Sequence, residues 1–268
     1  MRVITLDLTC NNACVFCAQG DLFARSTSES SERAASSDVK AWLDAVCPGE
    51  VVALQGGEPT LRDDLPDLCA ALAERGARRI LLQTNGRRLA YRAFARALRA
   101  ATDKLSLNVS LHGSTEPMHD YHTQVAGSFR QTILGLRNAR AEGLEASVTT
   151  VVTRSNYRHL ADIVKVGAQL GVVAMEFVPA QRFGRAASAA DRVIAPLELV
   201  RPYLSRAVAE ARAARIGFVA FGQASEPGLE ERFAGLGEVE SKDRQVLLGD
   251  ESLSKRIGAR EVGYATAP

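Results

Sequence analysis

Three cysteines lie within eight residues near the start of the chain, and their spacing limits what the chain can do. Cys10, Cys14 and Cys17 follow a C-x3-C-x2-C pattern directly after the apolar residues of a strand predicted at 2–9. No fourth cysteine stands at ligand spacing. A structural zinc site closes its tetrahedron with four protein ligands, and an iron–sulfur cluster usually takes four thiolates. Three thiolates leave one metal position open, and an open position is where metal chemistry takes place.

The composition is that of an ordinary soluble globular protein, because 46% of the 268 residues are apolar and 24% are charged. The net charge of +2 gives no basis for a nucleic-acid partner. No apolar run approaches the ~18–20 residues that span a bilayer, and Met1 leads into a predicted strand without the features of a signal peptide. We therefore expect a cytoplasmic protein without a membrane partner, whose clustered cysteines are reduced thiols that bind metal rather than form disulfides.

The pattern of apolar and turn-forming residues predicts alternating strands and helices over roughly the first 180 residues. Strands are predicted at 2–9, 50–55, 79–83, 105–111, 146–152 and 172–178, and helices at 38–46, 61–75, 89–101, 128–142 and 156–170. Six such repeats require a parallel sheet with helices outside it, but they are too few for an eight-fold barrel of ~250 residues. The periodicity alone does not separate a partial barrel from an open doubly wound sheet.

Two polar stretches interrupt this alternation. Residues 20–37 and 113–127 are both predicted to be loops. His119 and His122 fall in the second stretch, and we expect them to be solvated. They are poor candidates for metal ligands, because no cysteine or carboxylate stands at a usable spacing from them.

The C-terminal third is predicted to contain less regular structure. A helix is predicted at 196–216 and a seventh strand at 217–221. We therefore divide the chain into a core at 1–185, a helix with an extra strand at 186–222 that completes the core, and a polar C-terminal extension at 223–268. The composition of this extension permits partial disorder.

Three more motifs follow the cysteine loop, each just after a predicted strand. They are Gly56-Gly57-Glu58-Pro59, Thr84-Asn85-Gly86 and Ser110-Leu111-His112-Gly113. Consecutive glycines let a ligand approach the backbone closely, and Thr-Asn-Gly is a strong turn signal. The carboxyl ends of parallel strands lie on one rim, where α/β folds build their sites. We therefore expect all four motifs to meet at that rim.

The four motifs, in this order over roughly residues 1–185, resemble the radical S-adenosylmethionine (SAM) superfamily. The resemblance implies an α/β fold that is a partial (β/α)6 TIM-like barrel with parallel strands and a short C-terminal extension. It also implies a [4Fe–4S] cluster on Cys10, Cys14 and Cys17, with SAM chelating the fourth iron. The Ser-Leu-His-Gly segment resembles the molybdenum-cofactor and peptide-maturase branch, without the additional cysteines that bind auxiliary clusters.

The resemblance implies a role in SAM binding for several residues at the rim. Gly56, Gly57 and Glu58 would bind the methionine ammonium through backbone carbonyls and the carboxylate. Phe16 would pack near the adenine, with a core phenylalanine beneath the loop as the alternative.

Two further residues at strand ends would also meet SAM. Ser110 would contact the cofactor, with an ordinary strand serine as the alternative, and Val178 would touch the adenine mainly through its backbone.

Other residues at the rim are candidates for the substrate side. Thr84, Asn85 and His112 lie at the same predicted edge and would contact the substrate. Arg182 and Arg185 follow the predicted strand at 172–178, where they would meet an anionic group or serve as plain surface charge.

The reaction that the resemblance implies is reductive cleavage of SAM to a 5′-deoxyadenosyl radical. The radical would abstract a hydrogen atom from a small metabolite or a peptide in a biosynthetic pathway. An external one-electron donor of the flavodoxin or ferredoxin type would supply the electron. Two alternatives stay open. One is a glycyl-radical-enzyme activase, and the other is a zinc- or cluster-stabilised binding module without turnover, with His112 or His122 as the fourth ligand.

Overall fold

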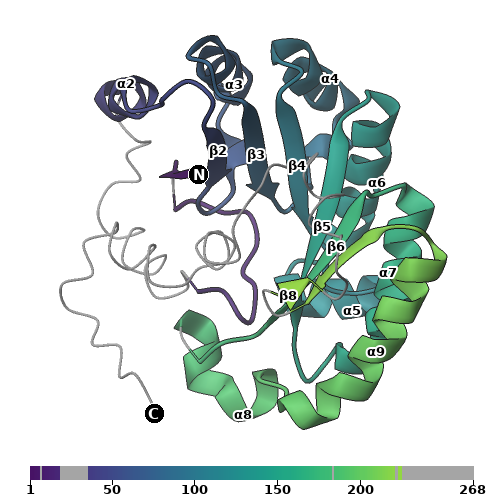
Figure 1. Cartoon of the computed structure of the whole chain (residues 1–268). Helices are drawn as coiled ribbons and strands as arrows, with labels where there is room; N and C mark the ends of the chain where they lie inside the picture. The colour runs from purple at the N-terminus through teal and green to yellow at the C-terminus, as the bar shows by residue number, and fades with distance from the viewer. Residues whose placement is uncertain (7, 19–35, 183, 221–222, 225–268) are drawn as a thin grey trace.

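The computed structural model describes residues 1–6, 8–18, 36–182, 184–220 and 223–224, which form a curved sheet with helices on its outer side (Figure 1). The strands are β1 (Arg2–Thr5), β2 (Val51–Gln55), β3 (Arg79–Thr84), β4 (Leu105–Ser110), β5 (Glu145–Val152), β6 (Ala174–Pro179), β7 (Gly217–Ala220) and β8 (Gln223–Ala224). They are neighbours in sequence order. Strands β1 to β7 are parallel, and β8 is antiparallel to β7. Within the described ranges β1 pairs only with β2 and β8 only with β7, so the sheet is open.

The helices connect successive parallel strands, as a βα-repeat fold requires (Figure 1). The α-helices are α2 (Ser36–Asp44), α3 (Leu65–Glu74), α4 (Arg92–Ala101), α5 (Glu116–Thr123), α6 (Ser128–Ala141), α7 (Leu160–Leu170), α8 (Ala190–Val193) and α9 (Leu197–Ala213). Short 3₁₀ helices are η1 (Pro59–Leu61), η2 (Arg88–Ala90), η3 (Tyr157–His159) and η4 (Gly184–Ala189). The predicted partial barrel of parallel strands is confirmed, and its predicted seventh strand is present.

The hydrophobic core lies between the sheet and the helices. Alternate residues of the strands face it, as the two-residue period of a strand requires. These residues are fully buried, and they include Leu54, Leu82, Leu107, Val148 and Phe177. The outer face of the sheet therefore carries the stability of the fold and leaves its inner face available for function.

The inner face of the sheet changes character along the strands. Near the amino ends of the strands, Val3, Ala53 and Leu81 pack together as a small apolar cluster. Further along, the Thr149 hydroxyl lies 2.7 Å from Asn108 Oδ1 and 3.2 Å from Glu176 Oε2. The inside of the open barrel is thus polar toward the carboxyl ends of these strands.

The prediction of a loop at 113–127 is wrong in its middle, because Glu116–Thr123 forms α5. A proline stands in the first turn of this helix, where its missing N–H is not needed. At the other end Gln124 adopts a left-handed conformation with φ 58°, and its N–H donates to Asp120 O at 2.8 Å. A helix of eight residues is shorter than the window over which helical periodicity can be recognised.

Other element boundaries differ from the predictions by a few residues. The strand predicted at 2–9 ends at Thr5, and the helices predicted at 61–75, 89–101 and 156–170 are each preceded or begun by a 3₁₀ turn. The prediction of 172–178 becomes Ala174–Pro179. Residues 19–35 and 225–268 lie outside the described residues, and with them most of the predicted loop at 20–37 and nearly all of the predicted extension at 223–268.

Helix α6 contacts the turn after β3 so closely that one of its residues must be glycine. A Cβ added at Gly135 would lie 2.2 Å from the carbonyl oxygen of Gly86. Gly135→Ala should therefore lower the free energy of unfolding by about 1–3 kcal/mol through overpacking, although alanine gains about 1 kcal/mol in an open helix. Urea unfolding followed by circular dichroism measures the change. The neighbouring exposed residue provides the control: Leu134→Ala should stay within about 0.5 kcal/mol of wild type. An equally stable Gly135→Ala variant would contradict this packing.

Candidate metal and cofactor site

The cysteine loop, residues 8–18, lies directly on the end of β2. A Cβ added at Gly57 would be 2.2 Å from the Thr9 carbonyl oxygen, so no other residue fits there without moving the loop. That same oxygen accepts a hydrogen bond of 2.7 Å from the Glu58 N–H. Gly56 has a φ of 145°, a conformation that residues with side chains rarely adopt. Gly57 therefore permits a close contact between backbones, and Gly56 adopts a backbone conformation that favours glycine.

Two further elements hold the loop from other sides. The N–H groups of Ala13 and Val15 each donate over 2.9 Å to carbonyl oxygens at the end of α5, those of Thr123 and His122. On the third side the Arg185 N–H donates to Cys17 O at 3.0 Å. The loop is thus fixed by hydrogen bonds of its own backbone.

The turn after β3 forms the fourth contact with the cysteine loop, through Asn85 and Arg87. Asn85 Nδ2 donates to Asn11 Oδ1 at 2.6 Å. Arg87 Nη1 donates to Asn11 O and, at 2.8 Å, to Asn12 Oδ1. Arg87 had no role in the motif analysis, because its partners lie some 75 residues away in the sequence.

The three loop cysteines are thiols of intermediate burial and are not joined in disulfides. Burial, together with the charge of Glu58, raises the pKa of Cys10 to about 12. Burial also raises the pKa of Cys14, and the charges of Cys17 and Cys10 raise it further. The three sulfur atoms are therefore near enough to repel one another as thiolates, and a bound cation reverses that balance because metal coordination deprotonates thiols.

This donor set fits an iron–sulfur cluster. Three thiols whose charges affect one another lie on a loop with a fixed backbone, at the rim where the other motifs meet. In the described part of the chain, no three His, Cys, Asp or Glu side chains converge on a point where they would hold a single metal ion. A [4Fe–4S] cluster makes a different demand, since it spreads its thiolates over separate irons.

Glu58 is buried and joins the end of β2 to the turn after β3. Its Oε1 accepts from the Thr60 N–H at 3.0 Å and from the hydroxyls of Thr60 and Thr84 at 2.5 and 2.6 Å, and its Oε2 accepts from the Asn85 N–H at 2.6 Å. Burial raises the pKa of this carboxyl, and these hydrogen bonds to its charged form oppose the rise. The motif glutamate is therefore a rigid part of the rim.

Three histidines form a buried cluster beneath the cysteine loop. His112, His119 and His122 are each at most 3% exposed. The rings of His112 and His119 stack with centroids 5.8 Å apart, and Phe16 meets His112 edge-on at 4.7 Å. The expectation that His119 and His122 are solvated is therefore wrong, because α5 turns both toward the interior.

Hydrogen bonds determine how each histidine of this cluster is held. His119 Nδ1 accepts from the His112 N–H at 3.1 Å, and His112 Nδ1 accepts from the Val151 N–H at 3.2 Å. His122 Nδ1 lies 2.7 Å from Met118 O, and its Nε2 lies 2.7 Å from the Thr153 hydroxyl. Burial lowers the pKa of all three side chains, that of His119 to about 4. The cluster is accordingly neutral near pH 7.

The remaining predicted site residues lie at or near the same rim. Ser110 ends β4 with a half-buried side chain, and Val178 near the end of β6 is 8% exposed. Phe16 also packs against a small apolar cluster that contains Ala180, Ala186 and Val193. Thr84, Asn85 and His112 are buried and engaged in hydrogen bonds within the chain. Arg182 is exposed, and Arg185 is half-buried beside the loop.

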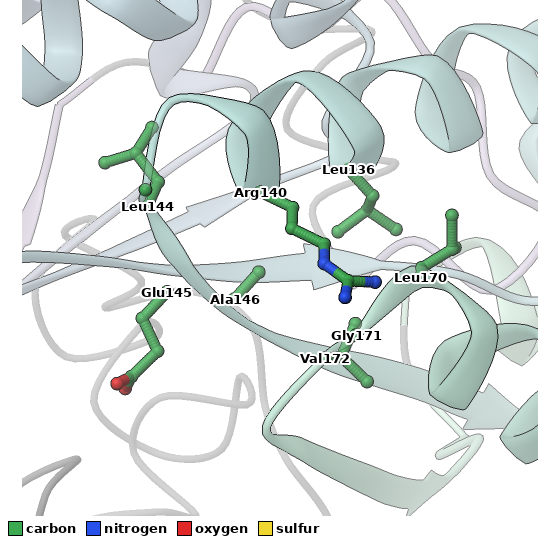
Figure 2. Close-up of a pocket in the computed structure, with 9 residues that line it drawn as sticks. Leu136, Arg140, Leu144, Glu145, Ala146, Leu170, Gly171 and Val172 are labelled. Atoms are coloured by element: carbon green, nitrogen blue, oxygen red, sulfur yellow. The ribbon is translucent and has the colours of Figure 1, made fainter.

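A cavity of about 230 Å³ lies at the edge of the barrel where the strands begin, opposite the rim that carries the cysteine loop (Figure 2). It is lined by residues at the ends of α6 and α7 and at the start of β5, and the Arg140 side chain lies in it. The Arg140 guanidinium lies close to Gly171, where an added Cβ would come within 2.6 Å of Nη1. In α/β barrels this edge serves stability rather than chemistry.

Comparison with known proteins identifies the family to which the chain belongs. Residues 8–166, more than half of the chain, match the family model described as the radical SAM superfamily. The chain therefore belongs to the radical SAM superfamily, whose cofactors are a [4Fe–4S] cluster and SAM. Its relatives in the superfamily are enzymes.

Two relatives indicate how far the similarity extends. An AdoMet-dependent heme synthase from Nitratidesulfovibrio vulgaris is 28% identical over 199 residues, which are 74% of this chain and 53% of that protein. A probable GTP 3′,8-cyclase from Pyrobaculum aerophilum is 34% identical over 152 residues, 54% of this chain and 46% of that one. The chain thus spans about half the length of these relatives.

A solved structure supports the fold. SuiB from Streptococcus suis bound to S-adenosylmethionine superposes with a TM-score of 0.62 at 17% identity, over 89% of this chain and 52% of SuiB.

No helix in the described ranges is both long enough and apolar enough to cross a membrane.

The buried histidine cluster predicts how stability changes with pH. The pKa of His119 falls from 6.5 to about 4 on folding, so the unfolded chain binds its proton more tightly, and stability drops as the pH falls below 6.5. For this group alone we expect a loss of about 2 kcal/mol in the free energy of unfolding between pH 7 and pH 5. Urea titrations at several pH values measure it.

His119→Gln should remove much of this dependence, because the amide oxygen can still accept from the His112 N–H without titrating. The exposed His159→Gln is the matched control and should leave the curve in place. An unchanged pH dependence in His119→Gln would contradict this assignment.

Proposed function

We propose that the chain reductively cleaves SAM and uses the resulting radical to abstract a hydrogen atom from a small metabolite or a peptide in a biosynthetic pathway. The observation that carries this proposal is the cysteine loop, which is fixed on four sides at the rim of an open barrel whose inner face is polar. An external one-electron donor of the flavodoxin or ferredoxin type would supply the electron.

Each part of the rim has a role in this proposal. When bound, the reduced cluster would supply one electron to SAM, whose cleavage would give methionine and a 5′-deoxyadenosyl radical. Cys10, Cys14 and Cys17 would hold the cluster through their three thiolates and would leave one iron for SAM. Gly56 and Gly57 offer backbone carbonyls to the methionine ammonium. Glu58 offers Oε2, which accepts a single N–H in the described part of the chain and retains capacity for another donor.

The other SAM contacts would come from strands on the far side of the barrel. Ser110 and Val178 stand at or near the ends of β4 and β6, where a ligand inside the barrel reaches them. Phe16 would shield the adenine on the side of the histidine cluster. Thr84, Asn85 and His112 are engaged within the rim, so we assign them to holding its shape rather than to direct contact with substrate.

The inner face of the sheet suggests what the substrate offers. Asn108, Thr149 and Glu176 lie together on this face and supply amide, hydroxyl and carboxylate groups. Such groups bind hydroxyl, amine or amide donors of a ligand. A polar metabolite or a peptide backbone provides these donors.

The test is formation of 5′-deoxyadenosine from SAM by anaerobically reconstituted protein and a chemical reductant. Wild type should be brown and should produce 5′-deoxyadenosine. Replacing Cys10, Cys14 or Cys17 by alanine should lower this product at least 100-fold, because two thiolates do not retain the cluster. Cys47→Ala is the matched control, since this exposed cysteine lies outside the loop, and it should retain wild-type activity.

The same experiment separates the proposal from a binding module without turnover. A colourless wild-type protein with one zinc per chain and no 5′-deoxyadenosine would favour the binding module. Transfer of deuterium from a labelled candidate substrate into 5′-deoxyadenosine would identify the substrate and the hydrogen that is abstracted.

A further inference from the structure

We propose that Arg87 is the positioning residue that holds the cysteine loop in its metal-binding conformation and that its charge favours the reduced cluster. This inference rests on the proposed function, because it concerns the same cluster. The inference goes beyond the proposed function because it assigns a role to a residue outside all four motifs.

The contacts of Arg87 join three segments that are distant in the sequence. Nη1 donates to both Asn11 O and Asn12 Oδ1, the second at 2.8 Å, and so grips the two residues that separate Cys10 from Ala13. Nε donates to Gln131 Oε1 on α6 at 2.6 Å. The side chain is thereby held from behind by a helix while its other end holds the loop.

Asn85, two residues before Arg87, binds both the loop and Arg87. Asn85 Nδ2 donates to Asn11 Oδ1 at 2.6 Å, and Asn85 Oδ1 accepts from the Arg87 N–H at 3.0 Å. Asn85 is itself fixed, because Glu58 and the Thr132 hydroxyl bind its backbone. The turn that carries Arg87 is therefore itself held in place by hydrogen bonds, so Arg87 can fix the position of the loop.

The hydrogen bonds of Arg87 are connected to the sulfur of Cys10 through the backbone of Asn12. The Asn12 N–H lies 3.4 Å from Cys10 Sγ, and the Asn12 side chain is the one that Arg87 binds. N–H groups that point at cluster sulfurs raise the reduction potential. A loop released from Arg87 would lose both the conformation of Cys10 and this N–H.

Arg87 brings a positive charge beside the cysteine loop, because it binds Asn11 and Asn12. Its acceptors here are neutral oxygens of Asn11, Asn12 and Gln131, and no ion pair recorded among the described residues includes it. Its field reaches the neighbouring cluster of histidines, where it helps to lower the pKa of His119. Three thiolates and a cluster that gains an electron are increasingly negative, so a nearby cation stabilises the reduced state.

Lysine can replace the charge but not the geometry of this side chain. Arginine presents a rigid planar fork that binds two separate acceptor groups at once, whereas lysine is a flexible point charge. The two substitutions at position 87 therefore separate positioning from electrostatics.

The experiment compares Arg87→Gln and Arg87→Lys with wild type, all reconstituted anaerobically and without SAM turnover. We measure the iron and sulfide content, the rate at which a chelator removes iron, and the reduction potential by EPR-monitored titration. In Arg87→Gln we expect iron loss at least threefold faster and a reduced-to-oxidised ratio up to tenfold lower at fixed potential, which is a shift of up to about 59 mV for one electron. In Arg87→Lys, which keeps the charge but not the planar fork, we expect the same faster iron loss with a smaller fall in potential than in Arg87→Gln.

Arg96→Gln is the matched control, because Arg96 is exposed and binds Glu142 away from the site. Should Arg87→Gln fold poorly, Asn12→Ala removes one acceptor of the same guanidinium and should also accelerate iron loss. Wild-type iron loss and potential in Arg87→Gln, as in Arg96→Gln, would overturn this inference alone. A wild-type chain that takes up no cluster would overturn the proposed function as well.

Discussion

The backbone contact between Thr9 and the Gly57–Glu58 peptide is the constraint on which the rest of the site depends. Because an added Cβ at Gly57 would lie 2.2 Å from the Thr9 oxygen, the cysteine loop can approach the sheet only over glycine. The next residue, Glu58, then binds the turn after β3 through the Thr84 hydroxyl and the Asn85 N–H. The ends of three consecutive strands are in this way joined before any ligand is bound.

The electrostatics of the rim are consistent with this arrangement. Burial works against every charge here: it raises the pKa of Cys10 and of Glu58 and lowers the pKa of His112. The histidines therefore form a neutral support that contacts Phe16, and a bound cation would favour ionisation of the Cys10 and Cys14 thiols. Positive charge at the loop opposes this effect of burial on the thiols, and two arginines supply it: Arg87 beside Asn11 and Asn12, and Arg185 beside Cys17.

Sequence patterns predicted the parts of the site that are local in the chain. Alternating strands and helices identify a parallel sheet, and the ends of parallel strands share one edge, so motifs after Gln55, Thr84 and Ser110 had to meet. The helix α5 was missed because its two turns are too short for a periodic signal, and the burial of His119 and His122 followed from that error. The role of Arg87 was out of reach, since its acceptors on the loop are brought to it only by the folded sheet.

The extent of the family match also explains why the cofactor chemistry is clearer than the substrate. Residues 8–166 contain the cysteine loop and all three further motifs, the part of the rim to which we assign cofactor binding in the proposed function. Glu176, Val178 and Arg185 lie beyond this range, on and after β6. Relatives that share the first part are a heme synthase and a probable GTP cyclase, so the shared part does not determine one substrate. We assign specificity to the inner face of the barrel in the proposed function, because there the Thr149 hydroxyl connects the family-matched Asn108 to Glu176.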